Sequence, residues 1–177
     1  MSQRTNAQFE IRGVNHIVLT CRDMRRTVDF YSGLLGMPLI KTITLPRGMG
    51  QHFFFDIGNG DSLAFFWFRD APPSQPGVTH PANLVGRGSF VTAHASMNHL
   101  AFNVPEDKLE EYRRKLEAAG VTCSPILNHD DSEQQVSREI TPSTFVRSIY
   151  FQDPDGFTLE FAAWTRELGE QDVSYER

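Results

Sequence analysis

One pattern occurs twice in this chain and constrains its fold more than any other feature. The segments "GVNHIVLTC" (residues 13–21) and "SMNHLAFNV" (residues 96–104) each place Asn-His at the head of an alternating, strand-like run. The two histidines, His16 and His99, are 83 positions apart (99 − 16). An internal repeat with this spacing predicts that the chain is built from two similar modules.

A helical pattern follows each of these runs. Asp23 is a suitable N-cap for the first helix, and apolar residues then recur at helical spacing until Gly36. The second helical pattern occupies residues 109–119 and ends at Gly120. The interval from histidine to glycine is 20 positions in the first copy (36 − 16) and 21 in the second (120 − 99). We therefore expect the same local structure in both copies.

Three strand-like runs follow each helical pattern, and the turns "GNGD" and "DPDG" precede the last run of each copy. The runs are residues 38–45, 50–58 and 61–68 in the first copy and 122–127, 145–153 and 157–164 in the second. This order predicts an α+β fold in which two βαβββ repeats pair into a cup-shaped, incompletely closed barrel. The expected boundaries are an N-terminal tail (1–11), a first module (12–70), a Pro- and Gly-rich linker (71–95), a second module (96–164) and a C-terminal tail (165–177).

The composition excludes several classes of protein. A net charge of −5 and a pI near 5.6 argue against a nucleic-acid partner. No apolar stretch approaches the roughly 20 residues that span a bilayer, and no signal-peptide pattern opens the chain. We therefore expect a cytoplasmic protein that does not associate with a membrane. Cys21 and Cys123 lack a CxxC spacing and are expected to be reduced. The 14 phenylalanines exceed what one sheet face accommodates, so some rings should face a pocket or a partner.

Strand alternation indicates a metal site. In the last strand of the second copy, Leu159 and Phe161 suit the core face, which leaves Glu160 on the opposite face. The same reasoning places His16 and His99 on the face away from the helix. Two imidazoles and one carboxylate form a facial triad suited to Fe(II) or Mn(II), with Zn(II) also possible. A histidine at a strand start is more often a simple polar residue than a ligand, but a carboxylate within an apolar strand needs a partner.

The segments "NHIVLTCRDMRRTVDFYSGLLGM", "NHLAFNV" and "YFQDPDGFTLEF" resemble the vicinal oxygen chelate superfamily of glyoxalases, bleomycin- and fosfomycin-resistance proteins, epimerases and extradiol dioxygenases. The resemblance covers residues 12–164 and implies that His16, His99 and Glu160 bind a metal. It also implies that Ala64 stands where some members have a fourth ligand. A metal site with three protein ligands and an open position resembles the sites of the extradiol dioxygenases and of the fosfomycin-resistance transferases.

The extradiol signature Tyr-x-x-Asp-Pro-x-Gly is matched by residues 150–156, which implies that the Tyr150 hydroxyl reaches the substrate. The histidine that this signature places upstream is missing from "TPSTFVRS". His94, five positions before His99, is our expected catalytic replacement. His129 is a second candidate for this catalytic role. It lies in the polar insertion "LNHDDSEQQ", which we expect to act as a lid over the site. Both could instead be solvated loop histidines.

The leading hypothesis is an extradiol-type ring-cleaving dioxygenase that acts on an aromatic vicinal diol with Fe(II), as a homodimer. One alternative is a glyoxalase-like isomerase or lyase, or a resistance-type transferase, that uses the same metal site. A further alternative is a metal-free protein that binds a small molecule. The presence of three ligand-type residues, His16, His99 and Glu160, argues against this alternative.

Overall fold

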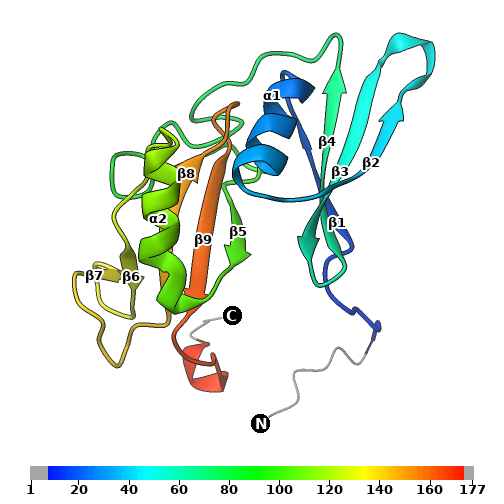
Figure 1. Ribbon diagram of the computed structural model, residues 1–177. Helices are drawn as coiled ribbons and strands as arrows, with labels where there is room; N and C mark the ends of the chain where they lie inside the picture. The colour runs from blue at the N-terminus through cyan, green and yellow to red at the C-terminus, as the bar shows by residue number, and fades with distance from the viewer. Residues whose placement is uncertain (1–7, 174–177) are drawn as a thin grey trace. The chain divides into compact units, whose positions relative to one another are not determined.

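The computed structural model describes residues 8–173, which belong to two compact units, residues 1–73 and residues 74–177 (Figure 1). Each unit contains one βαβββ module, so the predicted α+β class and the duplication are confirmed. Residues 1–7 of the predicted N-terminal tail and residues 174–177 of the predicted C-terminal tail lie outside the described residues.

The first unit has a four-stranded sheet in the order β1-β4-β3-β2, in which β1 runs parallel to β4 and the other pairs are antiparallel. Its elements are β1 (His16–Thr20), α1 (Met24–Val28), the π-helical turn η1 (Asp29–Leu34), β2 (Leu39–Thr44), the 3₁₀ turn η2 (Pro46–Gly48), β3 (Gly50–Gly58) and β4 (Asp61–Phe68). As predicted, Asp23 caps α1, because its Oδ1 accepts a hydrogen bond from the Arg25 backbone at 2.9 Å. Gly36, with φ of 73°, follows the helical segment.

The second unit has a five-stranded sheet in the order β5-β9-β8-β6-β7. Its elements are β5 (Leu100–Asn103), the 3₁₀ turn η3 (Glu106–Lys108), α2 (Leu109–Ala118), β6 (Leu127–His129), β7 (Val136–Ser137), β8 (Val146–Gln152), β9 (Thr158–Trp164) and the 3₁₀ turn η4 (Glu170–Asp172). Here too the first strand is parallel to the last, since β5 pairs with β9. The two modules therefore share one topology, and the second adds the β6–β7 hairpin.

The predicted position of one strand, residues 122–127, is wrong. The segment forms only an isolated bridge, between Cys123 and Phe151, and the ladder with β8 begins at Leu127. Pro125 explains the difference, because proline has no N–H group to donate to a ladder. The polar insertion after His129 is also not a plain loop, since it contains β7 and returns beside β6.

The helical segments cover one face of each sheet. In the first unit, the buried ring of Tyr31 lies 4.7 Å from the ring of Phe65. In the second unit, α2 lies across β8 and β9 (Figure 1), and its Tyr112 packs on Phe161 at 5.7 Å. Alternation along the paired strands then places His16 in one module, and Glu160 in the other, on the face away from the helix.

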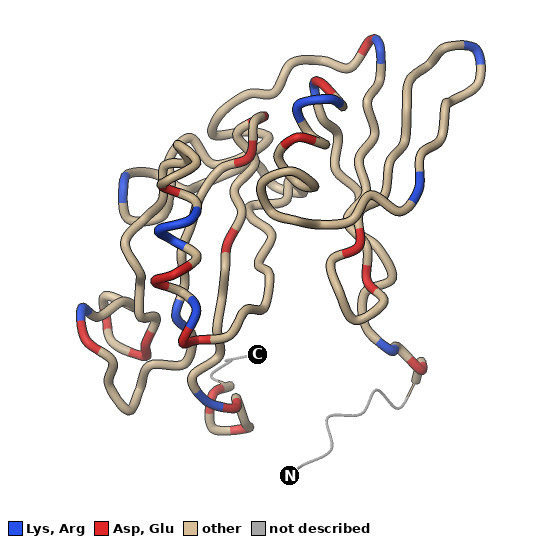
Figure 2. Tube along the Cα trace, viewed as in Figure 1, with Lys and Arg blue, Asp and Glu red and all other residues tan. Residues whose placement is uncertain are grey.

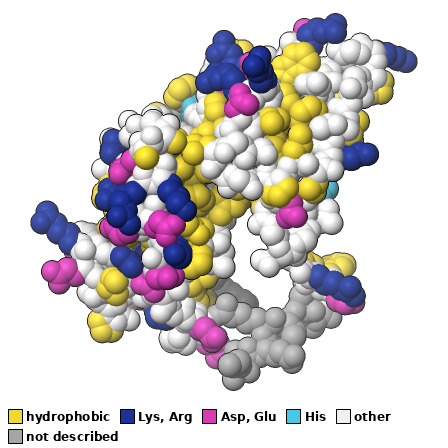
Figure 3. Space-filling view, viewed as in Figure 1, with side chains coloured by type: hydrophobic (Ala, Val, Ile, Leu, Met, Phe, Trp, Pro, Cys, Tyr) yellow, Lys and Arg dark blue, Asp and Glu magenta, His cyan; other side chains and the backbone are white. Residues whose placement is uncertain are grey.

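The outer surface of α2 is charged, with acidic and basic residues interleaved along the helix (Figures 2 and 3). Ion pairs join Lys115 to Glu111 at 2.7 Å and Arg113 to Glu117 at 3.1 Å, both at i,i+4 spacing. Such exposed pairs add little stability and mark a solvated surface. Among residues 8–173, no helix is long and apolar enough to cross a membrane. Cys21 and Cys123 are both buried, and neither forms a disulfide within the described part of the chain.

Candidate metal centre

Two of the predicted ligands lie together in the second module. The Nε2 atom of His99, immediately before β5, is 3.1 Å from the Oε2 atom of Glu160 on β9. The parallel pairing of Ala101 with Glu160 explains this proximity, because it brings the head of β5 beside the carboxylate. Glu160 is 5 % exposed, and a carboxylate so deeply buried requires a partner of opposite charge or a metal.

Asn98 fixes the orientation of the His99 ring. The Nδ1 atom of His99 lies 2.8 Å from Asn98 Oδ1, and since an amide oxygen only accepts, Nδ1 is the donor. In a neutral imidazole the Nε2 atom then carries a lone pair, and this lone pair faces the Glu160 carboxylate. Two such groups attract one another only through a shared proton or a shared cation. Ligands about 2.1 Å from an ion and at right angles are about 3 Å apart, so the observed separation fits a divalent metal.

The charge state of Glu160 also suits a ligand. Burial acts to raise the pKa of the Glu160 carboxyl, but His99 and the nearby hydroxyls of Ser148 and Tyr150 outweigh burial and hold this pKa below its usual value. Glu160 is therefore ionised at neutral pH, which is the form that binds a cation.

Tyr150 stands directly beside this pair. It is the cross-strand partner of Glu160 in the β8–β9 ladder, and its ring centroid is 5.8 Å from that of His99. Burial, together with the Glu160 charge, raises the pKa of the Tyr150 phenol, so the hydroxyl keeps its proton. The same hydroxyl lies 3.2 Å from the Nε2 atom of His129. The second module thus gathers a potential ligand pair and a tyrosine–histidine pair on one face of its sheet.

Two further hydroxyls lie on this face. Ser148 Oγ and Thr158 Oγ1 are buried and have no hydrogen-bond partner of regular geometry among the described residues. Ser148 pairs with Ala162 and Thr158 with Gln152, so alternation puts both side chains on the Glu160 face. Buried hydroxyls are normally satisfied. Ser148 lies close enough to Glu160 and Tyr150 to lower the pKa of both groups, so Thr158 is the clearer exception.

The first module repeats the histidine but not the carboxylate. The Nδ1 atom of His16 lies 2.7 Å from Asn15 Oδ1, the same arrangement as in Asn98 and His99. Ala64 pairs with Val18 as Glu160 pairs with Ala101, so alanine occupies the position that corresponds to the glutamate.

Aromatic rings cover the rest of that face of the first module. His52 stacks on Phe66 with centroids 3.8 Å apart and planes 12° from parallel, and Phe66 stacks on Phe68 at 4.9 Å. Phe54 joins the row, 4.3 Å from the His52 ring. We call these four residues the aromatic row. Three of them belong to the 14 phenylalanines of the sequence, and all four lie on the face opposite the one that packs against Tyr31.

The two histidines considered as catalytic replacements lie in different settings. His94 is exposed in a turn before β5, and none of the described residues forms a hydrogen bond or ion pair with its ring. His129 lies on β6 in contact with Tyr150. Within the second unit, no third His, Cys, Asp or Glu of the described chain joins His99 and Glu160 in a metal-binding group.

The fold defines a class: chains made of two βαβββ modules, in which a helix covers one face of each sheet. The sequence model of the Glyoxalase/Bleomycin resistance protein/Dioxygenase superfamily matches residues 13–161. The chain belongs to this family, also called the vicinal oxygen chelate superfamily.

Individual relatives differ in activity. Metallothiol transferase FosB of Shouchella clausii (strain KSM-K16) is 27 % identical over 168 residues, which cover 94 % of this chain and 89 % of FosB. The putative ring-cleaving dioxygenase MhqE of Bacillus subtilis (strain 168) is 25 % identical over 118 residues, 64 % of this chain but 34 % of MhqE. Among solved structures, FosX from Listeria monocytogenes, complexed with Mn(II) and sulfate, has a TM-score of 0.56 and 22 % identity, covering 88 % of this chain and 94 % of FosX.

Proposed function

We propose that this protein is a metal-dependent enzyme in which His16, His99 and Glu160 bind one divalent cation, with Fe(II) favoured and Mn(II) or Zn(II) as alternatives. The observation that carries the proposal is the 3.1 Å separation between His99 Nε2 and the buried carboxylate of Glu160, with the other ring nitrogen fixed by Asn98. His16 is included because Asn15 orients its ring in the same way.

The leading reaction is extradiol-type cleavage of an aromatic vicinal diol. When bound, the metal supplies Lewis-acid stabilisation of the diol oxygens and a route for electrons to dioxygen. The Tyr150 hydroxyl, adjacent to Glu160, donates a hydrogen bond to a substrate oxygen and holds the proton until ring opening. The 14 phenylalanines of the sequence support an aromatic substrate, because aromatic rings pack well against one another. His94 remains our sequence-based prediction for an acid or base.

Thiol transfer is the second candidate reaction. The FosB relative aligns over most of its own length, whereas the chain covers about a third of MhqE. In this reaction a thiolate would form a bond to a carbon atom of the substrate while a carbon–oxygen bond breaks, and the same cation would stabilise the resulting oxyanion. The buried Thr158 hydroxyl, which has no hydrogen-bond partner among the described residues, suits an oxygen-rich substrate in either reaction.

An assay with controlled metal content separates the two reactions. Protein loaded anaerobically with Fe(II) is mixed with catechol or 2,3-dihydroxybiphenyl and then exposed to air. We expect a coloured ring-cleavage product, absent in a Glu160→Gln variant that no longer holds iron. A colourless mixture with iron verified in the wild-type protein would overturn the dioxygenase. Consumption of glutathione by Mn(II)-loaded protein in the presence of fosfomycin would then establish the transferase.

We also propose that the protein works as a homodimer. β2 is an edge strand of the first sheet, and Leu39, Ile40 and Ile43 on it are all exposed. An exposed apolar edge strand is a common surface for association between chains. Light scattering after size-exclusion chromatography should give the mass of a dimer, and Ile40→Lys should shift the equilibrium towards monomer. A monomeric wild-type protein at high concentration would contradict the proposal.

A further inference from the structure

We infer that the predicted linker between the modules is part of the proposed metal centre: its segment 90–92 holds the side-chain amide of Asn98, and Asn98 in turn positions the ring of His99. For metal binding the inference rests on the proposed function, because His99 must be a ligand. The hydrogen bonds that join the linker to Asn98 do not depend on that function and are measurable in the metal-free protein.

The two ends of the Asn98 side chain contact different parts of the second unit. Its Nδ2 atom donates to the backbone oxygen of Phe90 at 2.7 Å and lies 3.4 Å from the Thr92 hydroxyl. Its Oδ1 atom lies 2.8 Å from His99 Nδ1. On the other side of the imidazole, His99 Nε2 lies 3.1 Å from Glu160 Oε2. The amide of Asn98 therefore joins the linker to the potential ligand pair.

The backbone oxygen of Phe90 determines which way round the Asn98 amide lies. A backbone carbonyl can only accept a hydrogen bond, so the group that faces it must be the NH2 group. Reversing the amide would place two oxygens against each other at 2.7 Å and would turn the NH2 group towards His99. Since a metal-binding histidine normally donates its other ring N–H to an acceptor, the linker contact selects the arrangement that suits a ligand.

The linker is itself held against the second module. Leu84 is buried, and the Arg87 guanidinium donates to the backbone oxygen of Cys123 at 2.8 Å. Nearer to the site, the backbone N–H of Ala93 donates to the backbone oxygen of Val78 at 3.1 Å. These contacts give this part of the linker a defined position, which the supporting element of a metal site requires.

The first module contains the same asparagine–histidine pair without this support. Asn15 Oδ1 lies 2.7 Å from His16 Nδ1, but none of the described residues accepts a hydrogen bond from the Asn15 amide nitrogen. The bond to Phe90 is therefore not a general part of the repeated motif. It is specific to His99, the histidine that lies beside the buried carboxylate.

Proton exchange at the Asn98 amide tests the linker contact directly. In ¹⁵N spectra of the metal-free protein, the side-chain amide protons of Asn98, assigned by their loss in Asn98→Ala, are compared with those of Asn59 in an exposed turn. We expect exchange with water to be about 10-fold slower at Asn98. A single glycine inserted between Val91 and Thr92 shifts the linker and should abolish the difference. Equal exchange rates at the two asparagines of the wild-type protein would overturn the inference.

Metal affinity tests whether the linker acts through Asn98. Competition with a chromophoric chelator for Zn(II) should show an affinity about 10-fold lower in the glycine-insertion variant. In the Asn98→Ala background, the same insertion should cause no further loss, because the link to His99 is already broken. An unchanged affinity, or an equal loss in both backgrounds, would contradict the inference.

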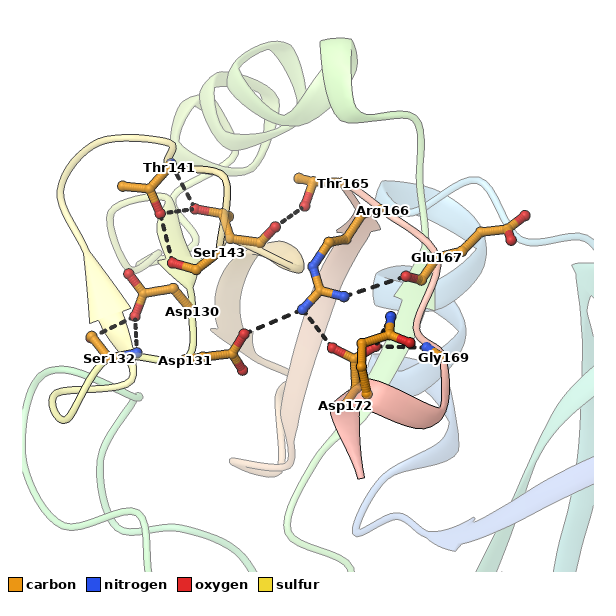
Figure 4. A network of polar contacts seen from close by, with 12 residues as sticks. Asp130, Asp131, Ser132, Thr141, Ser143, Thr165, Arg166, Glu167, Gly169 and Asp172 are labelled. Atoms are coloured by element: carbon orange, nitrogen blue, oxygen red, sulfur yellow. Dashed lines mark hydrogen bonds and ion pairs between the residues drawn. The ribbon is translucent and has the colours of Figure 1, made fainter. Parts of the chain in front are cut away.

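Two matched comparisons separate this effect from general damage to the fold. Thr92→Val removes a hydroxyl near Asn98 without changing the chain length and should lower the affinity by about 2-fold, whereas Thr92→Ser should stay near wild type. Figure 4 shows the Arg166 guanidinium between Asp131 and Asp172, at 3.3 and 2.7 Å, in another polar network of the same unit. Arg166→Gln disrupts that network and should leave the affinity unchanged.

A similar loss of affinity in both Thr92 variants, or a loss in Arg166→Gln, would show a general effect of the fold and would overturn the inference. If the wild-type protein binds no divalent metal, the proposed function fails, and the exchange rates of the Asn98 amide still decide whether the linker holds this side chain.

Discussion

Phe54 and Tyr150 occupy the same place in the two modules. Phe54 pairs with Ala64 across β3 and β4, and Tyr150 pairs with Glu160 across β8 and β9. The centroid of each ring also lies 5.8 Å from that of the histidine at the head of its own module. The two modules therefore share a scaffold and differ in chemistry, because the first has an apolar pair where the second has a phenol and a carboxylate.

Tyr150→Phe should keep the metal and lose turnover. The substitution removes the hydroxyl that the proposed function places against the substrate, while the ring and its packing remain, so we expect kcat to fall by about 10²-fold or more. Metal content, measured by elemental analysis, should be unchanged. Tyr112→Phe, which alters a tyrosine on α2, is the matched control and should leave kcat near the wild-type value. A Tyr150→Phe enzyme with full activity would remove Tyr150 from the mechanism.

Asn98→Ala should weaken metal binding without removing a ligand. The amide oxygen of Asn98 holds the His99 ring in the orientation that presents Nε2 to Glu160. Loss of such a support lowers metal affinity by roughly 10–100-fold. Competition with a chromophoric chelator measures this change, and Asn83→Ala in an exposed loop serves as the control. Equal affinities in the two variants would show that Asn98 does not orient a ligand.

The sequence predicted the features that depend on local periodicity. Alternation in β9 placed Glu160 opposite the core residues, and the repeated Asn-His pair marked His99, which lies beside Glu160. That His16 shares a metal with this pair stays a prediction. The contact between His129 and Tyr150 was not predicted, because it joins residues 21 positions apart through a hairpin register. That register depends on where the β6 ladder begins, and the sequence pattern placed this strand too early, across Pro125. The nearest signal was the presence of His129 in an insertion that the first module lacks.

Gly156→Ala should be more destabilising than Gly58→Ala. Both glycines have positive φ values, 87° and 94°, so alanine at either position costs about 1–2 kcal/mol from the backbone alone. At Gly156 a Cβ atom would also lie 2.8 Å from Nε2 of the buried His80, whereas at Gly58 it would meet nothing within 4 Å. Urea unfolding measures the difference. His80→Ala in the Gly156→Ala background should recover part of the loss; equal costs at the two glycines would rule out the clash.

Stability should decrease as the pH falls below neutrality. Burial lowers the pKa of His80, opposed in part by Asp155, and burial also lowers that of His129. In the unfolded chain both rings titrate near about 6.5, so between the native and the unfolded pKa the unfolded state binds more protons. The free energy of unfolding should therefore be highest above about pH 7 and should decline as the pH falls through 6.5 towards the native values.

Urea titrations between about pH 7.5 and about pH 5.5 check this dependence while most carboxylates remain ionised. The double variant His80→Gln, His129→Gln should show a shallower decline, because it lacks both groups. A free energy of unfolding that stays constant or rises as the pH falls in the wild-type protein would contradict the assignment of two buried, neutral histidines.

Crystals of the Mn(II)-loaded protein, measured at the manganese absorption edge, test the central claim most directly. We predict one strong anomalous peak per chain, bonded to His99 Nε2 and Glu160 Oε2 at about 2.1–2.2 Å, with the His16 imidazole as a third ligand. A peak at another place, or a loaded crystal in which His99 and Glu160 remain in direct contact with no metal beside them, would contradict the account.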